Sequence, residues 1–389
     1  MKTTRSPADP AAINILSRHA LAIRRACSAL GLSLGLALPA AAAPFTVINL
    51  VTDDQTVNAA QITDPHLTNA WGISHSPTSP FWVSSNGAGL SVLYRVNPVN
   101  NATTKVGLEV AIPGAANVTG QVFNIGGAGN FNGNAFLFVS EDGTISGWRN
   151  ALGTTAEVLQ MASDANSYKG TAISLIGGDA YLYSANFESG KIDVLKGNPA
   201  APDLAGSFAD ANIPSGYAPF NVQNVGGTLY VTYAVRNPVT GDDVAGPGNG
   251  LVDAFDLQGN FLARVGSNGT LNSPWGLAQA PMSFGAIAGD LLVGNFGDGR
   301  INVFDLSSDA FIGQLLGVGG IPIEIEGLWG LIAGNDGGAG SSQSIYFSAG
   351  PGDEEHGLFG VIAVPEPDSM ALAALGIAMM GVARRRAVS

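Results

Sequence analysis

The residues of this chain that could do chemistry are oxygen-bearing side chains at matching points of a repeated sequence pattern. The first group lies at the start of the first apolar segment of each repeat. The second group lies in the turn that follows the second apolar segment. Amide and carboxylate oxygens of this kind suit a hard cation such as Ca²⁺, which takes 6 to 8 oxygen ligands. The first group is Asn69, Asn221, Asn272 and Glu326, and the second is Asn86, Glu141, Asn186 and Asn295.

Two acidic segments add candidates for metal binding and catalysis. Asp242 and Asp243 lie in a glycine-rich insert, residues 241–250, that could form a metal-binding flap, although it lacks EF-hand spacing. His356 follows three acidic residues and could act as a general base or a metal ligand. A simpler interpretation stays open for all of these residues, in which acids and Asn side chains serve solvated turns.

The sequence lacks the motifs of several enzyme classes. It contains no Gly-x-Ser-x-Gly nucleophile elbow, no HExxH zinc motif and no phosphate-binding Walker loop. The single cysteine, Cys27, falls in a segment expected to be removed, so the mature chain has no cysteine chemistry. Glu326, Glu141 and His356 are the acid–base candidates that the pattern offers.

The segments that must position these residues repeat along the chain. Each copy is followed by a second apolar segment, a glycine-containing turn, and a third segment that alternates apolar and polar residues, as a half-buried strand does. Successive copies lie about 50 residues apart, so six similar units follow one another. Three copies carry Trp71-Gly72, Trp275-Gly276 and Trp329-Gly330, and degenerate copies begin at Gly120, Gly170 and Pro219.

Six units with room for four short strands each predict an all-β fold, a six-bladed β-propeller over residues 44–363. The last unit is one strand short, and we expect the alternating run from Phe45 to Val51 to complete it and remove an open sheet edge. If the Trp-Gly phrases open the innermost strands, both groups of oxygen-bearing residues face one end of the central channel. The tryptophans are expected as wedges between blades. A seven-bladed propeller and a pair of β-sandwiches are the alternatives.

The N-terminal residues 1–43 have the layout of a secretory signal peptide. Arginines precede the apolar run from Ala29 to Leu38, and the small residues up to Ala43 offer a cleavage site. The residues after Arg24-Arg25 fit a twin-arginine signal poorly, which favours the general secretory route.

The C-terminal residues 364–389 combine three elements in order. Pro365, Glu366 and Pro367 come first, and an apolar stretch from Met370 to Ala383, expected as a short helix, follows them. This stretch has only about 14 residues, whereas a spanning helix needs roughly 20. Three arginines, Arg384, Arg385 and Arg386, then close the chain and would keep its end in the cytoplasm.

This order resembles the PEP-CTERM sorting signal of Gram-negative bacteria. The resemblance implies export to the cell envelope or beyond, transient membrane association through the C-terminal helix, and processing by an exosortase. It also implies an association with exopolysaccharide or surface proteins. The body resembles NHL and YVTN-type six-bladed propellers, and the whole chain looks like an uncharacterised family of PEP-CTERM propellers. That family resemblance rests on the Trp-Gly phrases, the insert 241–250 and the Gly357–Gly360 end, and it implies no reaction.

The charge of the exported body limits its partners. Residues 44–363 contain nine basic and 27 acidic residues, a formal charge of about −18. Nucleic acid and polyanionic surfaces are therefore excluded as direct partners, because binding them relies on cations. The sequence favours a binding module for a glycan, a peptide or a partner protein. The alternative is an exported metal-dependent hydrolase or lactonase, with Ca²⁺ at the channel mouth.

Overall fold

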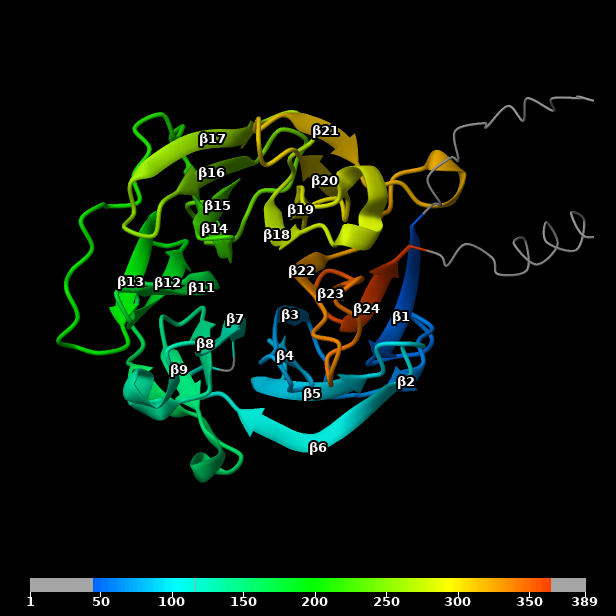
Figure 1. Ribbon diagram of the computed structural model, residues 1–389, viewed down its shortest axis with the longest axis horizontal. Helices are drawn as coiled ribbons and strands as arrows, with labels where there is room; N and C mark the ends of the chain where they lie inside the picture. The colour runs from blue at the N-terminus through cyan, green and yellow to red at the C-terminus, as the bar shows by residue number, and fades with distance from the viewer. Residues whose placement is uncertain (1–44, 116, 365–389) are drawn as a thin grey trace, which may run out of the picture. The chain divides into compact units, whose positions relative to one another are not determined.

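The computed structural model describes residues 45–115 and 117–364, and these residues form six β-sheets around a central axis (Figure 1). Each sheet is one blade, and its first strand lies closest to the axis. The prediction of a six-bladed propeller is therefore confirmed, against the seven-bladed and sandwich alternatives. Blade 1 is β3 (Ala70–Ser74), β4 (Phe81–Ser85), β5 (Leu90–Val96) and β6 (Thr103–Ala111); blade 2 is β7 (Val118–Phe123), β8 (Phe136–Ser140), β9 (Ile145–Trp148) and β10 (Glu157–Gln160).

Blades 3 to 5 continue in chain order. Blade 3 is β11 (Tyr168–Ile176), β12 (Asp179–Asn186) and β13 (Lys191–Lys196); blade 4 is β14 (Tyr217–Val225), β15 (Thr228–Val235), β16 (Leu251–Phe255) and β17 (Phe261–Ser267); blade 5 is β18 (Pro274–Gln279), β19 (Leu291–Asn295), β20 (Ile301–Phe304) and β21 (Phe311–Gln314).

Blade 6 joins the two ends of the described chain. It contains β22 (Leu328–Ala333), β23 (Ile345–Ala349) and β24 (Leu358–Ala363), followed outward by β1 (Thr46–Thr52) and β2 (Ile62–Thr63). β1 runs antiparallel to β24, with Ile48 opposite Val361. The predicted closure by the N-terminal run is confirmed, and β2 adds a short parallel strand that the sequence pattern did not reveal.

Blade 3 departs from the expected four strands, because it has only three. Pro199 and Pro202 follow β13 closely, and proline cannot donate to a strand ladder. The chain from Gly197 to Gly216 therefore crosses to blade 4 without a strand. Short 3-10 turns are the only helical elements of the described residues, at Gly127–Gly129, Phe131–Gly133, Asn150–Leu152, Met282–Ile287 and Val318–Gly320.

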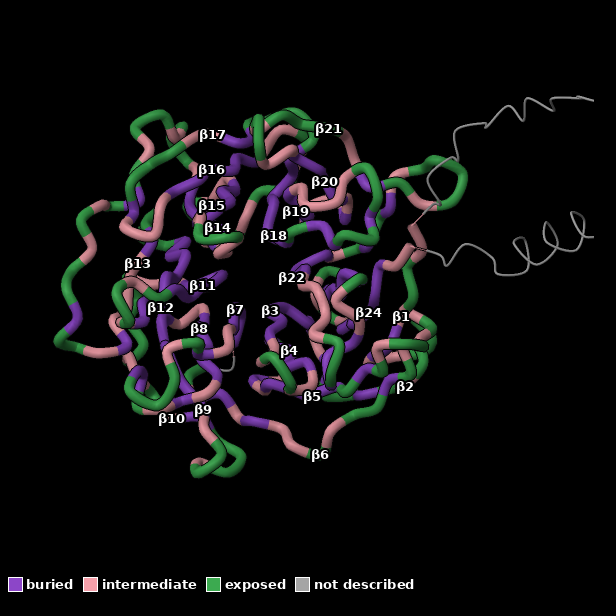
Figure 2. The backbone as a smooth tube through the Cα atoms, in the orientation of Figure 1, coloured by how far each residue is buried: buried purple, intermediate pink, exposed green. Residues whose placement is uncertain are grey.

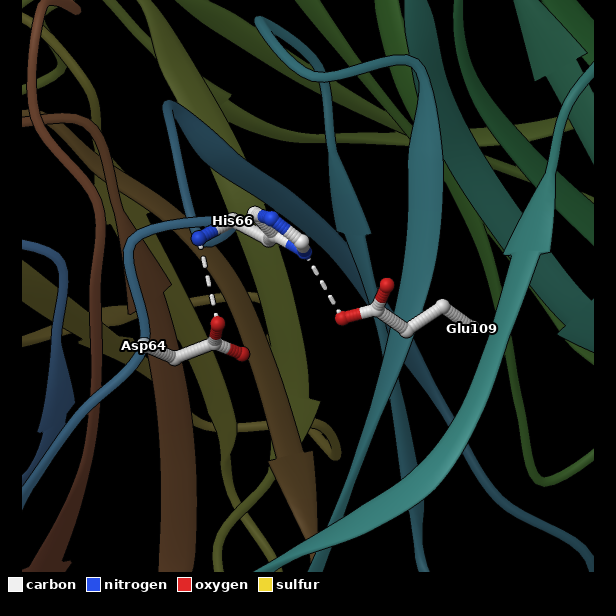
Figure 3. Close-up of side chains that lie close together, drawn as sticks. All are labelled: Asp64, His66 and Glu109. Carbon is white, nitrogen blue, oxygen red and sulfur yellow. Dashed lines mark hydrogen bonds and ion pairs between the residues drawn. The ribbon is translucent and has the colours of Figure 1, made fainter.

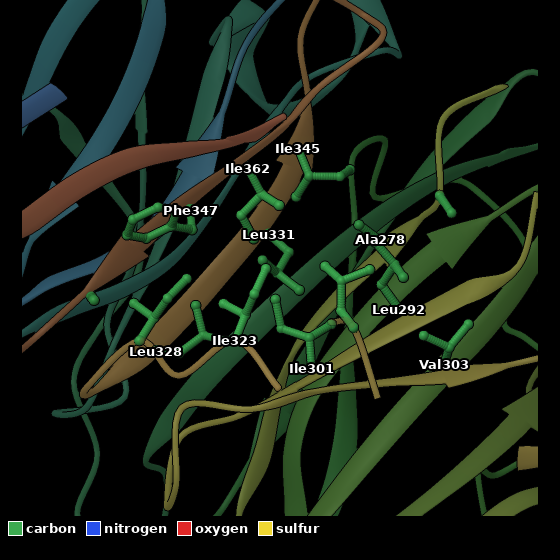
Figure 4. Packing of buried hydrophobic residues seen from close by; sticks show 14 of the residues in the cluster. Ala278, Leu292, Ile301, Val303, Ile323, Leu328, Leu331, Ile345, Phe347 and Ile362 are labelled. Carbon is green, nitrogen blue, oxygen red and sulfur yellow. The ribbon is translucent and has the colours of Figure 1, made fainter. Parts of the chain in front are cut away.

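The hydrophobic core lies between neighbouring blades. Figure 4 shows one such layer, in which Leu292 and Ile301 of blade 5 meet Leu328, Leu331 and Phe347 of blade 6. Figure 2 shows that the inner strands are mostly buried, whereas exposed residues gather on the outer strands and loops. Burying apolar side chains on both faces of each blade, at about 25 cal/mol per Å², fixes the blades against one another.

The predicted signal peptide and the C-terminal segment from Pro365, with its expected short helix, lie outside the described residues. Within the described part of the chain, no helix is long and apolar enough to cross a membrane.

Candidate functional site

Every innermost strand carries a β-bulge at the position of the Trp-Gly phrase. A bulge adds one residue to a strand and re-aims its side chain. Six residues share this position, one from each blade: Trp71, Thr119, Lys169, Phe220, Trp275 and Trp329. We call the end of the channel reached by these residues the front end, and the opposite end the back end.

The glycine of each phrase allows the inner strands to approach closely. A Cβ atom on Gly72 would lie 2.4 Å from the carbonyl oxygen of Thr119 in the next blade. A Cβ on Gly276 would lie 2.8 Å from the carbonyl oxygen of Trp329. Asn221 takes the corresponding position in blade 4 and donates from Nδ2 to the carbonyl oxygen of Trp275 across the gap, at 2.7 Å.

Aromatic side chains close the channel below the front end. Trp329 is stacked between Trp71 and Phe296, with ring centroids 3.8 and 3.9 Å apart. Trp275 and Phe220 meet the edge of Trp329, each at 5.8 Å. The expectation that the tryptophans wedge between blades is therefore corrected: they are buried, but the bulges direct them to the axis, where they pack on one another.

Lys169 is the charged member of the six bulge residues. Its side chain is only 6% exposed, its Nζ lies 5.3 Å from the ring centre of Trp71, and it forms an ion pair with Glu141 of blade 2. Burying an unpaired ammonium would cost several kcal/mol, so Glu141 is the group that keeps Lys169 stable on the axis.

A chain of hydrogen bonds continues from this ion pair across the front end. Asn86 donates to Glu141 at 3.2 Å, and Asn69 donates to Asn86 at 3.4 Å. Asn69 also donates to Oε2 of Glu354 at 2.6 Å, while its Oδ1 accepts from the indole of Trp329 at 3.0 Å. Side chains from blades 1, 2, 3 and 6 thus form one connected network above the aromatic rings.

The two glutamates of this network have pKa values displaced in opposite directions. Burial raises the pKa of Glu141, but the charge of Lys169 and hydrogen bonds from Lys169, Asn86 and Asn117 outweigh it, so the net pKa is lowered. Burial raises the pKa of Glu354, and repulsion from Glu141 adds to the rise. Paired carboxyl groups with separated pKa values are typical of functional sites.

Asp243 brings a third carboxylate to the front end. It belongs to the insert between β15 and β16, as expected from the sequence, whereas its neighbour Asp242 is exposed. Burial raises the pKa of Asp243, and the charge of Lys169 only partly offsets the rise. Oδ2 of Asp243 and Oγ of Ser273 are buried without completing a hydrogen bond to any described residue, and buried polar atoms normally have a partner.

The backbone is unusual at several of these residues. Asn69 and Ser273 both have φ of 45°, and the consecutive residues Asp353 and Glu354 have φ of 54° and 68°. Left-handed backbone is costly for residues other than glycine and clusters at functional sites. In the loop between β23 and β24 it places Glu354 against Asn69.

The other predicted residues lie outside this network and bond to different groups. The oxygens of Asn272 and Glu326 accept from the backbone amides of Gly246 and Gly352, at 2.6 and 3.1 Å. Asn186 donates to Asn166, which precedes β11 of the same blade, and Asn295 donates to Asp298 of its own turn. Of the two predicted groups, Asn69, Asn86 and Glu141 meet in one network. The predicted calcium ion stays a prediction.

His356 does not join this network. Its Nδ1 pairs with Asp53 at 2.9 Å near the surface, and this hydrogen bond and the charge of Asp53 raise the pKa of His356. The sequence pattern pointed to His356 as the candidate in this loop and gave no signal for Glu354, two residues earlier. A signal for Lys169 was present, because the degenerate copy at Gly170 places Lys169 in the position of Trp71 and Trp275.

A second cluster of titratable groups lies near β2, away from the channel (Figure 3). Asp64, His66 and Glu109 are the only three His, Cys, Asp or Glu residues of the described chain whose ligand atoms lie within 4.8 Å of one another. Lys105 contacts both carboxylates at 2.6 Å, and Tyr94 donates to the remaining oxygen of Asp64, also at 2.6 Å. A metal ion would have to displace Lys105, so we interpret this cluster as a structural ion-pair network.

Below the aromatic rings the channel continues to the back end, where the lining residues differ from those of the front end. A cavity of about 30 Å³ next to Trp275 has room for one or two water molecules. Beyond it, two hollows of about 500 Å³ each share Gln223, Asn224 and Ile332. The residues that line these two hollows include no Asp, Glu, Lys or Arg.

Comparison with known proteins identifies relatives and a sorting signal. The uncharacterised protein R648 of Acanthamoeba polyphaga mimivirus is 32% identical over 336 residues, which cover 81% of this chain and 79% of R648. Protein L690 of the same virus is 32% identical over 328 residues, covering 80% of this chain and 84% of L690. The chain belongs to the family of these two proteins. Family membership assigns no activity, because both relatives are uncharacterised.

Residues 363–387 match the PEP-CTERM protein-sorting motif, so this family member carries a bacterial export and envelope-sorting signal. The motif implies processing by an exosortase. Among solved structures, an α-L-arabinofuranosidase from Fusarium graminearum is similar, with a TM-score of 0.52 and 11% identity over 82% of this chain and 97% of that enzyme. At this identity the similarity concerns the propeller fold alone.

Proposed function

We propose that this protein is an exported binding module that holds a positively charged ligand at the front end of its propeller channel. The observation that carries the proposal is the network of Glu141, Lys169 and Glu354, with Asp243 beside it. Three carboxylates and one ammonium face each other there, a formal charge of −2. A cationic group on a ligand would balance this excess.

The surroundings of the network support a cationic ligand over a neutral one. Lys169 is already paired with Glu141, so Glu354 and Asp243 are the carboxylates left to meet a ligand. The aromatic rings below them are buried, which leaves little flat surface for a sugar ring to stack on. The net charge of −13 for the whole chain adds long-range attraction for cations and repels polyanions.

Among the ligand classes that suit an exported module, these features favour a basic peptide segment or a basic partner protein. Association with an acidic exopolysaccharide would then require a bridging cation. Retention in the extracellular matrix is part of this proposal, as is processing of the tail before release.

Calorimetry with a panel of short ligands tests the proposal. Tri-lysine, an uncharged peptide of the same length, a neutral oligosaccharide and a tri-glutamate peptide should be titrated into the protein at low and moderate salt. We expect heat of binding from tri-lysine, weakened by salt because exposed charges are screened. Equal binding of the neutral ligands, or binding of tri-glutamate alone, would contradict the proposal.

A second candidate function is an exported hydrolase or lactonase, with a metal at the same mouth. The opposite pKa displacements of Glu141 and Glu354 favour it, because a general acid and a general base need separated pKa values. Glu354 would act as the acid and Glu141 as the base. A panel of lactones and esters assayed with and without Ca²⁺ tests this candidate, and activity lost in Glu354→Gln would favour it over the binding module.

A further inference from the structure

An exposed apolar surface lies at the junction of blades 5 and 6. Its members belong to β21, to the loop that follows β21, and to β1 of the neighbouring blade. Their exposure ranges from 38% to 71%, with Val318 at 71% and Ile321 at 66%. We call this surface the apolar rim: Phe311, Ile312, Leu316, Val318, Ile321, Val47 and Ile48.

The apolar rim surrounds the place where the described chain begins and ends. The backbone amide of Phe45 donates to the carbonyl oxygen of Leu316 at 3.2 Å. Thr46 pairs with Ala363 at the end of β24, and Phe45 and Val364 pack against the same hydrophobic cluster. Figure 1 shows the loop after β21, in yellow to orange, beside the outer end of β1 and β24.

The sequence beyond Val364 restricts how far this surface can be from a membrane. Only five residues separate Val364 from Met370, the first residue of the apolar stretch within the sorting motif. Six residue steps of extended chain reach at most about 20 Å. Whenever that stretch is in a bilayer, the junction of blades 5 and 6 is therefore close to the lipid.

The composition of the loop fits this position. Residues 310–323 contain no charged side chain, although the described propeller is strongly acidic. Exposed apolar side chains that are not covered by protein mark interaction sites. Without charges of either sign, the loop suits the apolar boundary of a lipid surface, where carboxylates would be repelled by anionic headgroups.

We propose that the apolar rim contacts the lipid bilayer while the sorting tail is attached, and holds the propeller on its side against the membrane. In this orientation the channel axis is roughly parallel to the membrane, because the rim lies on the circumference of the ring. The front end then faces along the membrane surface and stays open to solvent. The sorting motif that begins at Pro365-Glu366-Pro367 follows Val364 directly, so its start is held close to the membrane.

Spin-label depth measurements on the full chain test the proposal. Cys27→Ser removes the only cysteine, and a nitroxide is then attached to Val318→Cys or, as a matched control, to Val239→Cys, a valine that is 90% exposed in the loop between β15 and β16 of blade 4. The protein is reconstituted into phosphatidylcholine vesicles. We expect the label at 318 to collide with lipid-dissolved oxygen at a depth of about 5–10 Å into the boundary between headgroups and acyl chains, and the label at 239 to stay in water.

Two results would overturn the proposal. A label at 318 as accessible to a water-soluble relaxation agent as the label at 239 would show that the rim does not contact lipid. A label at 318 that is shielded from both water and lipid-dissolved oxygen would show that a second copy of the chain covers the rim. Val318→Asp combined with Ile321→Asp, labelled at Ile312→Cys, should lose the lipid contact, whereas Val239→Asp should keep it.

Discussion

The two ends of the propeller channel are built from the same six strands but differ in chemistry. At the front end the strands carry β-bulges that turn Trp, Phe and Lys side chains to the axis, and Glu141, Asp243 and Glu354 gather above them. At the back end the strands finish with residues such as Leu277, Leu331 and Ile332, which line open, uncharged hollows.

This difference shows how a propeller separates stability from recognition. The repeated phrase supplies a bulge and a glycine in most blades, and the bulge residue can be apolar or charged without changing the sheet. Blades 1, 5 and 6 use this position for tryptophan, and blade 3 uses it for Lys169. Loops from other blades then supply the matching carboxylates, so the site depends on several blades at once.

Replacing Trp329 with Ala should have the largest effect on stability. The side chain is 1% exposed and packs between Trp71 and Phe296, so its loss should lower the free energy of unfolding by about 3–5 kcal/mol. Urea denaturation followed by circular dichroism measures this change. Met282→Ala, at the exposed edge of a back hollow, is the control and should change the free energy of unfolding little. Equal losses of stability in the two variants would contradict the claim that the two ends contribute differently to stability.

Replacing Lys169 with Met should rank second. The substitution keeps much of the apolar stem but leaves Glu141 beside the aromatic rings without its counter-ion, which should cost about 3 kcal/mol. It should also raise the pKa of Glu141, because the charge that lowers it is gone. Lys191→Met on the exposed edge of blade 3 is the control. A variant at 169 as stable as the control would mean that the ion pair contributes nothing to the front end.

Glu354→Gln should change the pH dependence of stability. The pKa of Glu354 is raised above its ordinary value of 4.5, so over the pH range just above 4.5 the folded state binds a proton that the unfolded state has lost. This group therefore stabilises the fold at low pH, and its contribution falls as the pH rises through that range. Thermal melts from pH 4 to 8 should show a flatter profile for Glu354→Gln; an unchanged slope would place Glu354 in a water-like environment.

Gln279→Lys at the back end should have the smallest effect. Gln279 is exposed and donates to the carbonyl oxygen of Gly289 at 2.9 Å, so stability should change by no more than about 0.5 kcal/mol. Binding of a cationic ligand should also be unchanged, since the hollow lies at the opposite end from the carboxylates. A clear loss of tri-lysine binding in this variant would move the ligand site to the back end.

Much of the fold could be predicted because it is encoded in local periodicity. The recurring phrase located the innermost strand of each blade, and the run from Phe45 to Val51 located the closing strand. The three-stranded third blade was missed because Pro199 and Pro202 break the pattern only where the fourth strand should begin.

The site was harder to predict because it depends on geometry between units. Asn69, which precedes the first phrase, reaches the front end as expected, but the β-bulges also bring residues within the phrases there, and one of them is Lys169 in blade 3. Consecutive left-handed residues turn Glu354 inward and leave His356 at the surface, and no alternation in the sequence encodes such a turn.

The central claim is that a cationic ligand binds at the front end through Glu354, and a matched pair of variants tests it directly. Glu354→Gln and Glu355→Gln remove the same charge from adjacent positions of one loop, but only Glu354 is bonded to Asn69, and Glu355 is exposed. Calorimetric titration of tri-lysine should show about tenfold weaker binding for Glu354→Gln, equivalent to about 1.4 kcal/mol, and near wild-type affinity for Glu355→Gln. Equal affinities for the two variants would contradict the account.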